Sequence, residues 1–150
     1  MEIGRMRAEH LTQMAELDEL CFPVPWTLGM FKSELRNPVA VYYIAEEAGT
    51  VIGYAGMQVI LDEGYITNVA VHPDFRRKGL ARALLARLLE DAEKRELAFL
   101  TLEVRQSNLP AQTLYQSLGF IEVGLRPGYY HSPREDALLM TLYRNKEDTP

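Results

Sequence analysis

Residues 68–81 read Asn-Val-Ala-Val-His-Pro-Asp-Phe-Arg-Arg-Lys-Gly-Leu-Ala. The apolar residues at the start predict a strand that ends at Val71 and is followed by a loop. The cations of residues 76–78 then precede Gly79 and the small Ala81, where a long helical pattern begins. The change of periodicity predicts a strand, a loop and a helix in succession, and the other elements can be placed around this unit.

The start of this helix has the features of an anion-binding site. The first turn of a helix has unpaired backbone N–H groups and a partial positive charge. Gly79 removes a side chain where an anion must approach, and Arg77 and Arg82 add positive charge. A solvated basic turn before a surface helix is the alternative interpretation. Neither G-x-x-x-x-G-K-S/T nor G-x-G-x-x-G occurs here, so binding of ATP or of a dinucleotide is poorly supported.

The periodicity of the whole chain predicts a mixed α/β architecture. Residues 79–95 form a strongly amphipathic pattern, with apolar side chains at Leu80, Leu84, Leu88 and Ala92. Further helices are expected over residues 7–22, from the cap at Thr27 to residue 37, and over residues 110–118. Strands are expected over residues 39–46, 51–61, 65–71, 98–105, 120–125 and 137–143. This order indicates a mixed sheet with helices on both faces in a single domain, residues 1–150, in which the polar residues 145–150 are a frayed tail.

Composition limits the class of protein. The chain has 150 residues, of which 47% are hydrophobic and 25% charged, and its formal net charge is −5. The acidic balance argues against a broad nucleic-acid surface, which is usually basic. One cysteine and three widely spaced histidines suggest neither a disulfide nor a metal site. No apolar run reaches the ~18 residues of a membrane span, and the first ten residues lack the apolar core of a signal peptide. A cytoplasmic location without membrane contact is therefore expected.

Several segments resemble one enzyme family. Residues 76–81, Arg-Arg-Lys-Gly-Leu-Ala, are similar to the Q/R-x-x-G-x-G/A signature of GNAT acyltransferases. The other segments that carry the resemblance are Cys-Phe-Pro-Val-Pro-Trp at 21–26, Thr-Asn-Val-Ala-Val at 67–71, Leu-Glu-Val-Arg-Gln-Ser-Asn at 102–108, Leu-Tyr-Gln-Ser-Leu-Gly-Phe at 114–120, Tyr-Tyr at 129–130 and Arg-Glu-Asp-Ala at 134–137. The resemblance implies the GNAT acyl-CoA N-acyltransferase fold, a twisted and mostly antiparallel sheet that is splayed between its fourth and fifth strands.

The resemblance also implies acetyl-CoA as co-substrate, without a metal, and the residues that hold it. The pantetheine arm would pair with the backbone of Val69, Ala70 and Val71, where an N–H group polarises the thioester carbonyl. The pyrophosphate would lie on the turn formed by Arg77, Lys78, Gly79, Leu80, Ala81 and Arg82. Asn108 would contact the cofactor, and its position before Pro110 also suits a helix cap.

Within this family, the segments resemble bacterial enzymes that acetylate the N-terminal alanine of a small-subunit ribosomal protein. The implied partner is therefore the N-terminal peptide of a ribosomal protein. Trp26 and Tyr130 are the candidate substrate-binding residues. Trp26 could instead fill the core, and Tyr130 is expected in a loop between the last two strands.

Glu103 is the candidate general base. The alternation over residues 98–105 places Glu103 and Arg105 on one face of a strand, opposite Leu102. A carboxylate in a central strand is costly unless it is paired or functional. A salt bridge to a neighbour such as Arg105, or a solvated sheet face, is the structural alternative. The resemblance implies a base that acts through water.

Tyr115 is the candidate acid. A phenol, with a pKa of ~10, is a better proton donor for a leaving thiolate than water is. Tyr115 shares a helical face with Leu118, so a packing role is the alternative. The resemblance implies a tyrosine beside the acetyl-CoA sulfur. His72 and Cys21 are interpreted as non-catalytic, because a direct transfer needs no acyl-enzyme.

Three other functions remain open at this point. The acceptor could be another protein N-terminus, a lysine or a small amine. The chain could also be a non-catalytic acyl-CoA-binding module, against which the presence of both Glu103 and Tyr115 argues. Direct nucleic-acid binding through residues 76–78 is disfavoured by the net charge.

Overall fold

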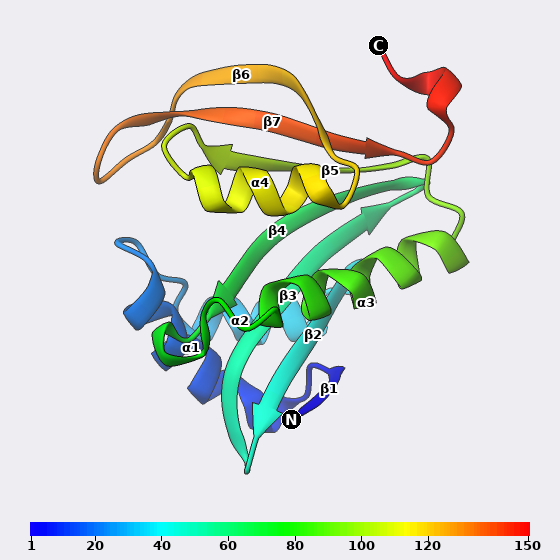
Figure 1. Ribbon diagram of the computed structural model, residues 1–150. Helices are drawn as coiled ribbons and strands as arrows, with labels where there is room; N and C mark the ends of the chain where they lie inside the picture. The colour runs from blue at the N-terminus through cyan, green and yellow to red at the C-terminus, as the bar shows by residue number, and fades with distance from the viewer.

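The computed structural model describes residues 1–150, which form a seven-stranded sheet and four α-helices (Figure 1). The strands are β1 (Glu2–Arg5), β2 (Ala40–Glu47), β3 (Thr50–Ile60), β4 (Glu63–Val71), β5 (Phe99–Arg105), β6 (Ile121–Tyr130) and β7 (Glu135–Tyr143). The helices are α1 (Leu11–Cys21), α2 (Leu28–Arg36), α3 (Leu80–Lys94) and α4 (Leu109–Ser117), with 3-10 turns at Ala8–His10, Pro73–Phe75 and Lys146–Asp148. The strand order is β1-β2-β3-β4-β5-β7-β6, and only β4 and β5 run parallel. The expected mixed, mostly antiparallel sheet is confirmed.

Side-chain alternation builds a core on each face of the sheet. In β2, Tyr43 packs into the cluster that contains Leu84 of α3. The preceding residue, Tyr42, points to the other face and packs with Met14 of α1 and Phe31 of α2. Figure 1 shows α3 crossing in front of β2–β4, with α2 behind these strands. Helices therefore cover both faces, as the sequence predicts. None of them is long and apolar enough to cross a membrane.

β4 and β5 pair over only three residues and then diverge. The pairs join Glu63–Gly64–Tyr65 of β4 to Phe99–Leu100–Thr101 of β5. On its other side β4 pairs with β3, and the register shifts so that Thr67 has no partner there. A bulge of this kind bends a strand. The two strands separate after Tyr65, as Figure 1 shows, so the splay expected between the fourth and fifth strands is confirmed.

The first strand is absent from the sequence prediction. β1 has four residues, and Ile3 is the only large apolar one. It lies at the edge of the sheet and pairs only with β2. Because backbone hydrogen bonds hold an edge strand of this kind, its side chains carry too little periodicity to reveal it.

β6 is longer than the predicted strand over residues 120–125. It continues through Pro127 to Tyr130, with a register shift against β7 between Arg126 and Tyr130. Proline is tolerated here because β6 is the other edge of the sheet, where one side of the backbone makes no ladder bonds. The prediction that Tyr130 lies in a loop is wrong, since Tyr130 ends the strand and the loop comprises residues 131–134.

Gly56→Ala is expected to lower the free energy of unfolding by about 1–3 kcal/mol. A Cβ at Gly56 would lie 2.2 Å from the Tyr42 ring. That ring is fully buried, and its hydroxyl is held by Glu34 and Asn68 at 2.7 and 3.0 Å. Urea unfolding measures the effect. Gly4→Ala is the matched control, because a Cβ at Gly4 in β1 meets no atom within 4 Å. Equal losses in the two variants would contradict the prediction.

Candidate active site

Two cavities meet at the splay between β4 and β5. The splay cavity, of about 540 Å³, lies between residues 66–69 of β4 and residues 102–105 of β5. The turn cavity, of about 670 Å³, lies between the end of β4 and the start of α3. Both volumes are in the range of small-molecule sites. The residues that line both cavities are Cys21, Phe22, Val69, Asn108, Ala111 and Tyr115. The cavities are therefore neighbours, and Tyr115 is at their junction.

Most of the residues predicted to hold a cofactor line the turn cavity. They are Val69, Ala70, Val71, Arg77, Gly79, Leu80, Ala81, Arg82 and Asn108. Lys78 is not among the lining residues, and its ammonium lies 5.4 Å from the centre of the Phe75 ring. The side chain of Asn108 accepts a hydrogen bond from the N–H of Ala111 at 3.2 Å, so this residue caps α4 while it faces both cavities.

The turn before α3 presents free backbone donors to the turn cavity. Gly79 has φ +79°, in the left-handed region, and no side chain caps the helix. The first N–H groups of α3 therefore lack both an intrahelical partner and a side-chain cap. Arg76 holds the turn in place, because its Nε donates to the carbonyl of Val71 at 3.0 Å. Arg82 donates to Ser117 Oγ of α4 at 2.6 Å. An anionic group fits this cradle in charge and in hydrogen-bonding capacity.

Glu103 lies on the cavity face of β5. Its neighbours Leu102 and Val104 are buried, whereas the Glu103 side chain lines the splay cavity with 25% of its surface exposed. Its ionic partner is Arg126 of β6, with 3.2 Å between Nε and Oε1. Arg105, the partner considered from the sequence, pairs with Glu135 instead. The carboxylate is thus both ion-paired and accessible from the cavity.

Tyr115 presents an unpaired hydroxyl at the junction of the cavities. Its ring is buried and packs on Phe120 with the centroids 5.6 Å apart. Burial raises the pKa of Tyr115 to about 12. No buried side-chain oxygen or nitrogen lacks a hydrogen-bond partner, and no protein group bonds this hydroxyl, so it faces open space in the cavities. The hydroxyl is a free hydrogen-bond donor.

Both predicted substrate-binding residues line the splay cavity. Trp26 lines it from the segment between α1 and α2, and its ring packs on Phe31 with 5.3 Å between centroids. Tyr130 lines it from the end of β6, with the Arg105 guanidinium 4.4 Å from its ring centre. Desolvation by burial raises the pKa of Tyr130. Trp26 therefore packs against the core and also lines the cavity, and its role in substrate binding stays a prediction.

Asp18, which has no predicted functional role, also lines the splay cavity. This carboxylate is buried, and it accepts hydrogen bonds from the Tyr54 hydroxyl and, at 3.0 Å, from the N–H of Trp26. Desolvation by burial raises the pKa of Asp18. Asn68 extends the network, because its Nδ2 donates to the Tyr54 hydroxyl at 2.9 Å. The signal in the sequence was an aspartate on the apolar stripe of a helix.

His72 and Cys21 differ in their relation to the cavities. His72 lies outside both, and its Nδ1 accepts a hydrogen bond from the N–H of Asp74 at 3.1 Å. Cys21 lines both, and its thiol donates to the Val71 carbonyl with 3.5 Å between sulfur and oxygen. Desolvation by burial raises the pKa of Cys21. This thiol is thus protonated, and no histidine contacts it.

The comparisons with known proteins agree with this fold. The model of the acetyltransferase (GNAT) family matches residues 11–120. The ribosomal protein bS18-alanine N-acetyltransferase of Escherichia coli K12 is 38% identical over 142 residues, which are 93% of this chain and 95% of that protein. The enzyme of the same name from Haemophilus ducreyi is 37% identical over 140 residues, 90% of this chain and 94% of that protein.

Solved structures show the same architecture. The crystal structure of the ribosomal-protein-S18-alanine N-acetyltransferase from Escherichia coli has a TM-score of 0.88 and 38% identity, with 95% of this chain and 92% of that chain covered. An N-acetyltransferase from Thermoplasma acidophilum, solved with coenzyme A, has a TM-score of 0.79 at 15% identity, with 95% and 98% covered, and shows the fold alone. The chain belongs to the acetyltransferase (GNAT) family and is similar over almost its whole length to ribosomal protein bS18-alanine N-acetyltransferases.

Proposed function

We propose that this enzyme transfers the acetyl group of acetyl-CoA to the N-terminal α-amine of ribosomal protein bS18, where alanine is the first residue. The observation that carries the proposal is the junction of the two cavities, with Tyr115 between them and Glu103 on the acceptor side. The similarity to enzymes named for this reaction supports it over nearly the full chain.

The turn cavity would hold acetyl-CoA, which supplies the acetyl group as a thioester. The free N–H groups at the start of α3, together with Arg77 and Arg82, would bind its pyrophosphate. The backbone of Val69, Ala70 and Val71 lines the same cavity and would pair with the pantetheine arm like an added strand. A backbone N–H fixed in this way stabilises charge that develops on the thioester oxygen.

Glu103 would accept the proton of the acceptor amine, directly or through a water molecule. An α-amine has a pKa of ~8, so about 10% of it is already neutral at pH 7. A lysine amine, with a pKa of ~10.4, is about 3 kcal/mol harder to deprotonate. The carboxylates of Asp18 and Glu103 in the splay cavity also suit a cationic acceptor. Trp26 and Tyr130 would form the walls on either side of the peptide.

Mass spectrometry of two peptides with acetyl-CoA tests the proposal. One peptide carries the N-terminal sequence of bS18 with alanine first, and the other is the same peptide with a blocked α-amine and an added lysine. Acetylation of the first alone is the expected result. Acetylation of the second alone would replace the N-terminal acceptor by lysine. Acetylation of neither, with acetyl-CoA bound, would overturn the acceptor and leave the acetyl donor in place.

Arg77→Ala is expected to raise the Kd of coenzyme A about 5–10-fold, because a charge-assisted hydrogen bond to phosphate is lost at an exposed site. Titration calorimetry at two ionic strengths measures the effect, which should be larger at low salt. Lys94→Ala is the matched control, since it removes a cation from the other end of α3. A Kd that rises equally in both variants would indicate a general charge effect and no phosphate contact at Arg77.

A further inference from the structure

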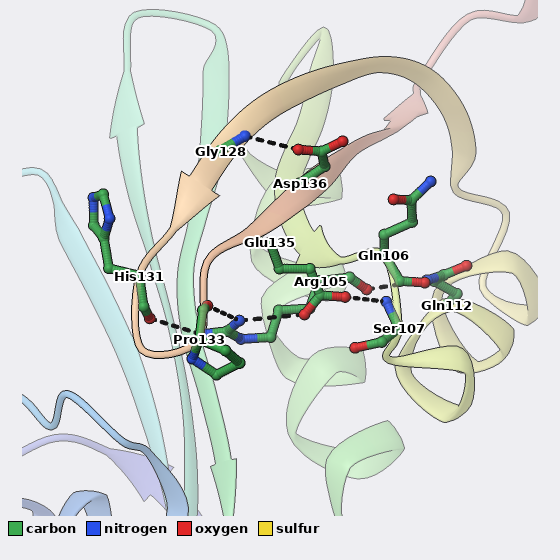
Figure 2. Close-up of polar contacts among 9 residues, drawn as sticks. All are labelled: Arg105, Gln106, Ser107, Gln112, Gly128, His131, Pro133, Glu135 and Asp136. Atoms are coloured by element: carbon green, nitrogen blue, oxygen red, sulfur yellow. Dashed lines mark hydrogen bonds and ion pairs between the residues drawn. The ribbon is translucent and has the colours of Figure 1, made fainter.

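We infer that Arg105 is a positioning residue, which together with Glu135 fixes the β6–β7 loop as one wall of the acceptor site. The inference rests on the proposed function, since it concerns the site assigned there to the acceptor peptide. Arg105 ends β5, two residues after Glu103 and on the same face. Figure 2 shows its side chain between the β6–β7 loop and the start of α4.

The Arg105 guanidinium uses its donors on the loop. Nη1 donates to the carbonyl of Pro133 at 2.9 Å and to Glu135 Oε1 at 3.2 Å, and Nη2 donates to the carbonyl of His131 at 3.1 Å (Figure 2). Cζ of the same group lies 4.4 Å from the centre of the Tyr130 ring. One side chain therefore contacts four residues between positions 130 and 135. Three of the five N–H donors of the guanidinium are thus engaged on this segment, and its charge is balanced by Glu135, so the side chain is oriented toward the loop.

Glu135 connects the same loop to the start of α4. Its Oε2 accepts a hydrogen bond from the N–H of Ser107 at 2.6 Å, while Oε1 accepts from Arg105. Hydrogen bonds from Ser107 lower the pKa of Glu135, so the carboxylate stays ionised at neutral pH. Gln112 of α4 donates to the carbonyl of Arg105 at 3.1 Å. These contacts tie the loop to the two elements that carry Glu103 and Tyr115.

The loop matters because its first residue, His131, lines the splay cavity together with Tyr130 at the end of β6. A loop that is ordered before the peptide arrives saves the entropy of ordering it on binding. β5 itself is held by seven pairs with β7, including Arg105 with Ala137, and α4 keeps its own cap at Asn108. Loss of the guanidinium should therefore loosen the acceptor wall and leave Glu103, Tyr115 and the turn cavity in place.

Steady-state kinetics of Arg105→Gln and Arg105→Lys test this assignment. Both variants are expected to raise the KM for the alanine-first peptide about tenfold, with kcat changed less than threefold and the Kd of acetyl-CoA unchanged. Lysine should not rescue, because a single ammonium cannot reach the same acceptors as a planar fork or stack on Tyr130 in the same way. Full rescue by lysine, or a KM within twofold of wild type in both variants, would overturn the assignment.

Arg144→Gln is the matched control. Arg144 pairs with Glu96 at 3.5 Å and donates to its carbonyl at 3.4 Å, at the far end of the β5–β7 pair. The Arg144→Gln variant should lose as little thermal stability as the Arg105 variants do. Its KM for the alanine-first peptide should equal that of the wild type.

Hydrogen exchange of residues 128–136 separates this inference from the proposed function, because it requires no acceptor. Exchange at least tenfold faster in Arg105→Gln than in the wild type is expected, and unchanged exchange would overturn the inference. If the wild type fails to acetylate the alanine-first peptide, the proposed acceptor is wrong, and the exchange result still decides whether Arg105 fixes the loop.

Discussion

Glu103→Gln is expected to lower kcat about 10²–10⁴-fold, the usual contribution of a positioned general base. The amide has the same shape as the carboxylate and cannot take a proton from the acceptor amine. The Kd of acetyl-CoA should not change, because Glu103 lines the splay cavity and not the turn cavity. Single-turnover measurements with the alanine-first peptide separate the transfer step from binding.

The fold should survive this substitution. The ion pair with Arg126 is the only charged contact of Glu103, and the Arg126 side chain is 55% exposed. Exposed ion pairs of this kind contribute little to stability. Glu122→Gln is the matched control, since it removes an exposed carboxylate from β6. A kcat within threefold of wild type in Glu103→Gln would show that another group, or solvent, deprotonates the amine.

The sequence predicts the elements whose side chains alternate between core and solvent. The pattern of α3 is confirmed to within one residue at each end, because Leu84 and Leu88 are fully buried against the sheet. β1 and the second half of β6 were missed because both are sheet edges, which backbone pairing holds with little side-chain burial. The splay itself was expected from a family resemblance. No local pattern indicates that β4 leaves β5 after Tyr65.

Some features of the candidate site also follow from the sequence, and others do not. The face of Glu103 follows from strand alternation, which the burial of Leu102 and Val104 confirms. Its ionic partner does not follow, because Arg126 reaches it from β6, on the far side of β7 in the sheet. Arg105 is closer to Glu103 in sequence, but it pairs with Glu135, which lies 30 positions further along the chain. Contacts of this kind depend on strand order, and strand order is a property of the whole fold.

Tyr115→Phe is expected to lower kcat about 10–150-fold, with the Kd of acetyl-CoA unchanged. The range corresponds to the loss of one hydrogen bond to a charged group, about 1.5–3 kcal/mol. The ring keeps its contact with Phe120, so folding should be preserved. Tyr143→Phe is the matched control, because it removes a tyrosine hydroxyl from β7, outside both cavities. Rates of single turnover for the two variants measure the difference.

The raised pKa of Tyr115 fixes what its hydroxyl can do. The pKa of this phenol, about 12, differs more from the pKa of a thiol, ~8.5, than the pKa of an exposed phenol does. Complete transfer of its proton to the leaving thiolate would be uphill, so we expect the hydroxyl to act by donating a hydrogen bond to the thiolate while the proton stays on tyrosine. The same raised pKa keeps the hydroxyl protonated at pH 8–10, because the proton is lost only as the pH approaches 12. We therefore expect no fall in the wild-type kcat between pH 8 and pH 10 from Tyr115. A basic limb in that range that disappears in Tyr115→Phe would show that the hydroxyl ionises there and would contradict the assignment.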